Sequence, residues 1–282
     1  LKGHYFDCVA DFTVLKPEQI NRDYQLFAGI TKQYIFISSA SAYQKPLSCY
    51  EITESTPLYN PYWDYAQNKI SCENELMDLY RRTGFPITII RPSHTYDEYN
   101  VPLCITGWKG CYSVVKRIRE ERPVIIPGDG TSLWTLTHNS DFARAFLGIA
   151  GNPHALGEAV NITSDEVMTW NQIYKTIADE LQVPFYVSSL FLHQAGPYDF
   201  KSCLLGERVQ TAVFKNDKLK RLVPGFHAAV PFRNGISTTL QNLISDPQLQ
   251  VEDPIFDSWC DSIISTLTQA AATVKSAFPT CI

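Results

Sequence analysis

A tyrosine and a lysine stand one helical turn apart in the segment Tyr65-Ala66-Gln67-Asn68-Lys69. Residues at positions i and i+4 share a helix face, so a phenol and an ammonium group can point to the same place. A free tyrosine has a pKa of about 10, and a nearby ammonium group favours the phenolate. The pair therefore predicts proton transfer to or from a substrate oxygen. Ser39, 26 residues upstream of Tyr65, is expected to hold that oxygen while a hydride moves at the adjacent carbon.

Hydrophobic patterning indicates the elements that must position these three residues. The runs at 33–39 and 86–92 are continuously apolar, which is typical of strands buried on both faces. Residues 63–82 between them predict an amphipathic helix, and 16–29 predict another after a strand-like run at 5–12. This order predicts an α/β fold, a Rossmann-like doubly wound parallel sheet. The alternative is an α+β protein in which three apolar runs fall in the same order.

Ligands of an open parallel sheet bind outside the carboxyl ends of its strands. Those ends are predicted at 11–12, 38–41 and 91–94, so three polar segments meet at one edge. The Tyr-x-x-x-Lys spacing alone is typical of a solvated helix surface. The position of Ser39 at the end of a buried strand, with the next buried strand following the helix, favours the catalytic interpretation.

Beyond residue 93 the pattern changes. Helices are predicted near 110–121, 140–149, 169–181, 216–222, 232–244 and 255–277, and strands near 123–126 and 158–162. We expect residues 1–165 to form the Rossmann-like domain, with 96–133 contributing to a second domain. Residues 166–282 are expected to form that second, smaller mixed α/β domain, where a substrate would bind.

Composition excludes several classes of protein. The 282 residues contain 24 Lys and Arg against 29 Asp and Glu, a formal net charge of −5, whereas a nucleic-acid binder is normally basic. The eight cysteines are scattered, without the spacing of a zinc site, so we expect reduced thiols and no metal. No apolar run approaches the roughly 18 residues that span a membrane. A cytoplasmic protein is the expectation.

Five segments follow one another in a familiar order: FISSASAY, YAQNK, IIRPSHTYD, IPGDGTSLWTLTHNSDFA and EAVNITSDEVMTW. On these motifs the sequence resembles the short-chain dehydrogenase/reductase superfamily, and within it the extended or atypical NAD-dependent epimerases and dehydratases. The resemblance implies an enzyme that uses NAD or NADP on a sugar, a polyol or a small carbonyl compound. It also implies a homodimer, often assembled through the helix that bears the tyrosine.

The resemblance also implies roles for individual residues. Ser39 would be the catalytic serine, Tyr65 the acid/base and Lys69 the residue that binds the cofactor ribose. The further candidate cofactor contacts are Asp11, Ser38, Pro92, Ser93 and His94. The candidate substrate contacts are Ser41, His94 and Trp134. Two of these have an alternative interpretation, since Asp11 could cap the following turn and His94 could satisfy a backbone carbonyl.

The sequence departs from the family pattern in two places. The glycine-rich turn that seats the pyrophosphate on a helix N-terminus and the first three strands are missing, so we expect an N-terminally incomplete chain. The only similar segment, Gly128-Asp129-Gly130, is followed by a strand-like run and is predicted to be a turn. Trp134 stands where sugar-nucleotide epimerases commonly carry a phosphate-binding arginine. It predicts a less charged ligand, or else it is a core aromatic.

Two alternative functions stay open. The atypical group includes chloroplast stem-loop RNA-binding proteins, and basic residues cluster at 116–119 and 218–221. RNA binding on a retained dehydrogenase scaffold would use these clusters, although solvated helix faces explain them better. The other alternative is a chain that is inactive because its pyrophosphate-binding half is missing.

Overall fold

The computed structural model describes residues 1, 3–184, 187–190, 194–195, 198–199, 202 and 204–277. The chain divides into two compact units, each assembled from three segments. The first contains Leu1–Asp97, Ser132–Met168 and Phe200–Phe232, and the second contains Glu98–Thr131, Thr169–Asp199 and Arg233–Ile282. The domain prediction differs at one place, because it assigned the whole of 166–282 to the second domain, whereas 200–232 lie in the first unit.

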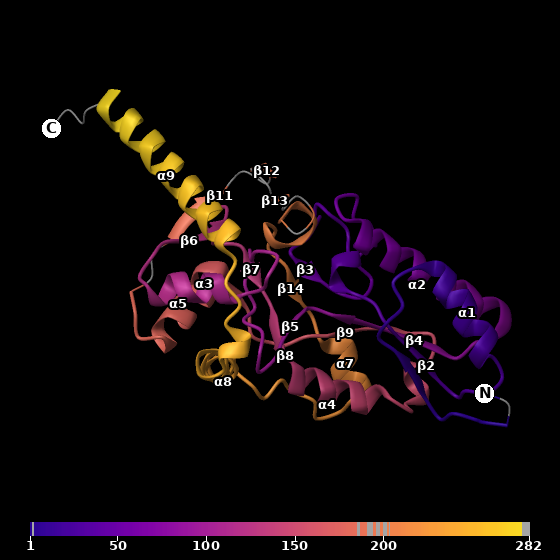
Figure 1. Cartoon of the computed structure of the whole chain (residues 1–282). Helices are drawn as coiled ribbons and strands as arrows, with labels where there is room; N and C mark the ends of the chain where they lie inside the picture. Colours follow the sequence, from indigo (N-terminus) through magenta and orange to yellow (C-terminus); the bar gives the residue numbers. More distant parts are fainter. Residues whose placement is uncertain are drawn as a thin grey trace. The chain divides into compact units, whose positions relative to one another are not determined.

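The first unit carries the predicted sheet and its covering helices (Figure 1). Its strands are β1 (Val9–Asp11), β2 (Tyr34–Ile37), β3 (Glu51–Ile52), β4 (Ile87–Pro92), β5 (His94–Tyr96), β7 (Leu133–Trp134), β8 (Leu136–His138), β9 (Ala159–Ile162) and β14 (Val213–Phe214). Its helices are α1 (Pro17–Phe27), α2 (Asp64–Thr83), α4 (Asn139–Ile149) and α7 (Asp217–Leu222), with the short helical turns η1 (Ala40–Ala42), η2 (Pro153–Ala155) and η3 (Leu204–Arg208).

Strands β1, β2, β4 and β9 form a parallel four-stranded sheet in that order. Side chains alternate between its two faces because successive residues of a strand point in opposite directions. Along β2, Tyr34 and Phe36 enter one core cluster while Ile35 enters the other. Each face of the sheet therefore contributes apolar side chains to its own core cluster. The predicted α/β fold with a parallel sheet is confirmed.

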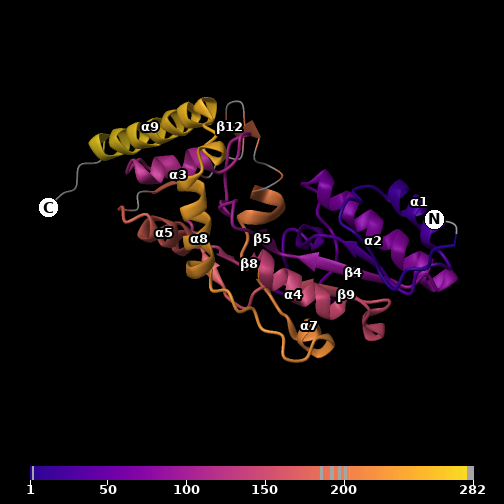
Figure 2. The same ribbon diagram turned by 60° about the horizontal axis from the view of Figure 1, so that its bottom comes forward.

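Two pairs of helices cover the two faces of this sheet. Helices α1 and α2 lie side by side on one face (Figures 1 and 2) and share its core with Phe36. Helices α4 and α7 supply the other core through Ala145, Ile149 and Leu219. Helix α2 ends at Gly84, whose φ of +73° gives the left-handed cap that glycine adopts without steric cost. This end returns the chain to β4.

The second unit is a mixed α/β assembly. Its elements are α3 (Tyr112–Arg119), β6 (Val124–Pro127), α5 (Trp170–Glu180), β11 (Val187–Leu190), β12 (Gln194–Ala195), β13 (Tyr198–Asp199), α8 (Phe232–Ser245), η4 (Pro247–Leu249) and α9 (Pro254–Ala277), while β10 (Met168–Thr169) spans the boundary between the units. Strands β6 and β11 pair in parallel. None of the described helices is long and apolar enough to cross a membrane.

Candidate functional site

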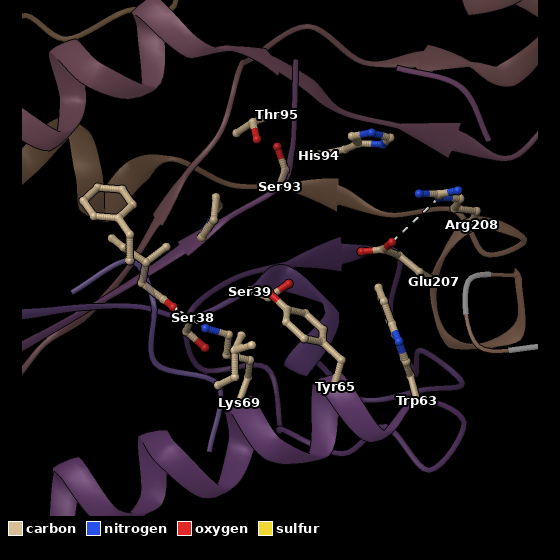
Figure 3. A pocket seen from close by; sticks show the side chains of 14 residues that line it. Ser38, Ser39, Trp63, Tyr65, Lys69, Ser93, His94, Thr95, Glu207 and Arg208 are labelled. Carbon is tan, nitrogen blue, oxygen red and sulfur yellow. Dashed lines mark hydrogen bonds and ion pairs between the residues drawn. The ribbon is translucent and has the colours of Figure 1, made fainter. Parts of the chain in front are cut away.

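A pocket opens at the carboxyl ends of β2 and β4 in the first unit (Figure 3). Its volume is about 380 Å³. The lining residues are Phe12, Leu15, Ile37, Ser38, Ser39, Trp63, Tyr65, Lys69, Pro92, Ser93, His94, Thr95, Glu207 and Arg208. The sequence-predicted site residues are therefore brought together here, except for Asp11, Ser41 and Trp134.

Ser39 is held at the end of β2 by the turn that follows it. Its hydroxyl oxygen accepts the backbone N–H of Ser41 at 3.1 Å and the Ser41 hydroxyl at 2.8 Å. These bonds make Ser39 the N-cap of η1. Figure 3 shows its side chain beside that of Tyr65 at the pocket, and the two groups are close enough for Ser39 to lower the pKa of the phenol.

Tyr65 lies in the first turn of α2, half-buried against Trp63, with 5.1 Å between the ring centroids. Burial raises the pKa of Tyr65, and the polar contact with Ser39 opposes the rise without cancelling it. The pKa is therefore above the usual value, although the spacing from Lys69 predicted a depressed one. Desolvation of the phenolate outweighs the ammonium group, which is 5.7 Å from the Tyr65 ring centroid.

Lys69 is buried one helical turn further on. Its ammonium group donates to the backbone carbonyls of Val14 and Ile37, both at 2.7 Å, and lies 4.8 Å from the centroid of the Phe36 ring. Burial lowers its pKa. An ammonium group has three N–H donors, so these two bonds anchor the side chain and leave one donor at the pocket.

A buried ion pair lies beside this lysine. Arg91 of β4 donates through Nε to both carboxylate oxygens of Glu73, at 3.0 and 3.2 Å. The Ser38 hydroxyl donates to the same carboxylate. The i+4 spacing of Glu73 from Lys69 on α2 would pair these two residues, but Glu73 is the partner of Arg91. The two backbone carbonyls satisfy the lysine instead.

The segment after β4 forms the opposite side of the pocket. The hydroxyl groups of Ser93 and Thr137 form a hydrogen bond, with 2.9 Å between the two oxygen atoms. Burial, together with the charge of Arg208, lowers the pKa of His94 to about 3. The imidazole is therefore neutral, and its buried Nδ1 has no hydrogen-bond partner among the described residues. This nitrogen is able to exchange a hydrogen bond with a ligand.

Three predicted site residues do not line the pocket. Asp11 caps the turn after β1, since its Oδ1 accepts from Thr13 and Val14. Ser41 is fully buried and acts on Ser39 rather than on the pocket. Trp134, 2% exposed in β7, is a core aromatic. For Asp11 and Trp134 the structure thus favours the alternatives of capping and core packing.

The sequence analysis did not predict several residues that line the pocket. Among them are the aromatic Trp63 and the charged Glu207 and Arg208. Trp63 stands directly before α2, so its proximity to Tyr65 could have indicated it. Glu207 and Arg208 belong to η3, far along the chain, in a part assigned to the other domain. No spacing rule links them to Ser39.

The comparisons with known proteins agree with this arrangement. Residues 24–163 match the profile described as the NAD dependent epimerase/dehydratase family. That part of the chain is similar to this family. The expected resemblance is therefore confirmed, and the pocket is lined by residues of this segment together with Phe12, Leu15 and η3.

Three individual proteins illustrate the similarity. The chloroplast stem-loop binding protein of 41 kDa b of Arabidopsis thaliana is 28% identical over 63% of this chain and 43% of its own length. The uncharacterized UDP-glucose epimerase YtcB of Bacillus subtilis is 27% identical over 52% of this chain and 44% of its own. The UDP-glucuronic acid 4-epimerase of Bacillus cereus, solved with UDP-glucuronic acid and NAD, aligns with a TM-score of 0.61 at 19% identity, covering 76% of this chain and 62% of that one. The chain thus spans less than half the length of either curated relative.

Proposed function

We propose that the intact protein is an NAD(P)-dependent enzyme of the epimerase/dehydratase type, acting on a sugar, a polyol or a small carbonyl compound. The observation that carries this proposal is that Ser39, Tyr65 and Lys69 line one pocket, with the Lys69 ammonium group 5.7 Å from the centroid of the Tyr65 ring. The family of residues 24–163 supports it. The second unit is proposed to be the substrate-binding domain.

The described residues fit the nicotinamide and ribose part of such a cofactor. Lys69 keeps one N–H donor for a ribose hydroxyl, and Pro92, Ser93 and His94 offer a surface for the ring. NAD or NADP, when bound, would accept or supply a hydride. The described residues beside β1 contain no glycine-rich turn for the pyrophosphate, so Lys69 and the 92–94 segment are the contacts that the fit depends on.

The protein's own contribution is the movement of one proton. Ser39 would hold the reacting oxygen through its hydroxyl, and Tyr65 would take the proton from an alcohol or return it to a carbonyl. Because burial raises the pKa of Tyr65, the phenol is protonated in the free protein and suited to donate first. A bound cationic ring would favour the phenolate and hence the opposite direction.

Direct binding and turnover test this proposal. The intact protein should bind NADH or NADPH, measured by the change in nicotinamide fluorescence. Tyr65→Phe should keep that binding and lose turnover by a factor of roughly 10² to 10⁴, the usual contribution of acid/base catalysis. Tyr50→Phe alters an exposed phenol (59% exposed) and should change neither. Absence of nicotinamide binding, or full turnover by Tyr65→Phe, would exclude the proposal.

RNA binding is less well supported, because most of the basic residues are already paired. Arg117 is buried against Asp257 and Asp261. Lys218 pairs with Glu158 and Lys220 with Asp165. Charges engaged in this way contribute less to a phosphate-binding surface, so the observations favour the enzyme.

The homodimer implied by the family resemblance is also a proposal. The exposed positions of α2 include Gln67, Ser71, Asn74 and Asp78. These side chains are polar, so a dimer formed through α2 would have a polar seam. Light scattering of the intact protein at micromolar concentration tests the prediction, and a monomeric mass would contradict it.

A further inference from the structure

Glu207 stands in the wall of the pocket that faces Tyr65 and His94. Figure 3 shows its carboxylate directed into the space between His94 above and Trp63 and Tyr65 below. Among the described residues its nearest cation is Arg208, at a long Nε–Oε2 distance of 3.9 Å. The carboxylate is therefore only loosely paired and presents oxygen acceptors to a ligand.

The position of Glu207 is tied to the loop that holds Ser39. Asn60, 1% exposed, donates from Nδ2 to the carbonyl oxygens of Ser41 and Gly206, both at 2.8 Å. One amide group thus joins the two sides of the pocket. Gly206 fits closely here, since an added Cβ would lie 3.3 Å from the Cβ of Trp63. The backbone that carries Glu207 is therefore held at the wall of the pocket, which preorganises the position of this residue for a ligand.

The charge of Glu207 is close enough to Tyr65 to influence the ionisation of the phenol. Burial raises its pKa, and the charges of Arg208 and Lys45 oppose the rise. The negative charge of Glu207 also contributes to the raised pKa of Tyr65. A second negative charge brought by a substrate to this place would meet Glu207 and destabilise the phenolate further.

Trp63 completes the set of groups beside this carboxylate. Its ring lines the pocket next to Tyr65 and Glu207. An aromatic face buries the C–H side of a sugar ring, while a carboxylate accepts hydrogen bonds from hydroxyl groups. An apolar face beside a fixed acceptor matches a ligand with both features.

We propose that Glu207 makes this site specific for substrates whose reacting part is neutral and rich in hydroxyl groups, and that it rejects those bearing a carboxylate there. The inference rests on the proposed function. Ligand hydroxyls would donate to the Glu207 carboxylate, with the ring over Trp63. An anionic group at the same place would face a like charge in a partly dehydrated site, which is the usual way in which a protein excludes a close analogue.

Two matched pairs of ligands test this. UDP-glucose is compared with UDP-glucuronic acid, and glucose with glucuronate, since each pair differs by a hydroxymethyl group against a carboxylate. Dissociation constants are measured by calorimetry at pH 8 with saturating NADH or NADPH, on the intact protein. Wild type should bind the neutral member at least about 10-fold more tightly.

Variants then separate charge from shape. Glu207→Gln should reduce the preference to less than about 3-fold, whereas Glu207→Asp, which keeps the charge, should retain most of it. Glu18→Gln makes the same charge change on the exposed surface of α1 and should change nothing. Equal thermal unfolding midpoints of the Gln and Asp variants show that both are folded.

The outcomes distinguish the two proposals. If the nicotinamide cofactor binds but the wild type prefers the anionic ligand, or if Glu207→Gln retains the wild-type preference, the role of Glu207 is wrong while the enzyme remains. If the cofactor binds and no ligand of either pair binds, the neutral-sugar class is wrong. If the cofactor itself does not bind, both proposals fail.

Discussion

The Arg91 guanidinium and the Glu73 carboxylate form an ion pair beside the pocket in which both side chains are at most 6% exposed. Arg91 also donates to the Tyr43 hydroxyl at 3.0 Å, and Tyr43 donates to Asn161 at 2.6 Å. The pair therefore joins α2, β4 and β9 through polar contacts in an otherwise apolar interior. The Ser38 hydroxyl donates to the Glu73 carboxylate, so the ion pair is also connected to the residue that directly precedes Ser39.

Removing one charge of this pair should destabilise the fold. Glu73→Gln leaves the Arg91 guanidinium buried without a counter-ion, which costs about 3 kcal/mol of unfolding free energy. Urea unfolding measures the loss. The exposed pair Arg82–Asp78 provides the control, and Asp78→Asn should cost less than about 1 kcal/mol. Equal effects of the two substitutions would contradict the buried role of Glu73.

The polar contact of Ser39 with Tyr65 should appear in the pH profile of turnover. Burial raises the pKa of Tyr65 and Ser39 lowers it, so Ser39→Ala should raise the pKa further. In the direction of alcohol oxidation the phenolate is required, and activity increases as pH rises through that pKa. The rising limb of the kcat/KM profile should therefore move to higher pH in Ser39→Ala. An unmoved limb, or one moved to lower pH, would show that Ser39 does not act on the ionisation.

His94 should make the protein sensitive to acid. Burial and the charge of Arg208 lower its pKa to about 3 in the folded chain, against about 6.5 when unfolded. Between these values only the unfolded chain binds the proton, so stability falls as the pH decreases below about 6.5. Because the ring is only part-buried, we expect about 1 kcal/mol between pH 6.5 and 5.

The corresponding measurement is urea unfolding of His94→Asn at several pH values. This variant should lose less stability on acidification than the wild type. His154→Asn, which alters an exposed histidine, should follow the wild-type curve. A steeper acid loss in His94→Asn would reverse the sign of the expectation.

Ser41 should act through Ser39 rather than through a ligand. Ser41→Ala removes the hydroxyl that donates to the Ser39 oxygen at 2.8 Å, leaving Ser39 free to turn. We expect kcat to fall about 10-fold because the reacting oxygen is held less well, while cofactor affinity is unchanged. Ser71→Ala, on the exposed side of α2, is the control. A loss of cofactor affinity with unchanged kcat would indicate a direct contact instead.

The local part of this site could be predicted from the sequence. Ser39, Tyr65 and Lys69 belong to consecutive elements, and strand ends and the i+4 rule fix where such residues go. The same rules failed for Glu73, because spacing along a helix does not show that Arg91 of a neighbouring strand is the stronger partner. They also could not place Ser41 or Trp134, whose burial depends on tertiary packing. Glu207 is separated from Tyr65 by a long excursion of the chain, and no local pattern encodes that contact.

The return of residues 200–232 to the first unit limits how the protein can be divided. Leu219 of α7 is completely buried in the same core cluster as Ile35 and Ile90. A polypeptide that stopped at residue 165 would leave this apolar face open to water and would also lose Glu207. The smallest autonomous form of the sheet must therefore be discontinuous in sequence, with artificial linkers in place of the two intervening excursions.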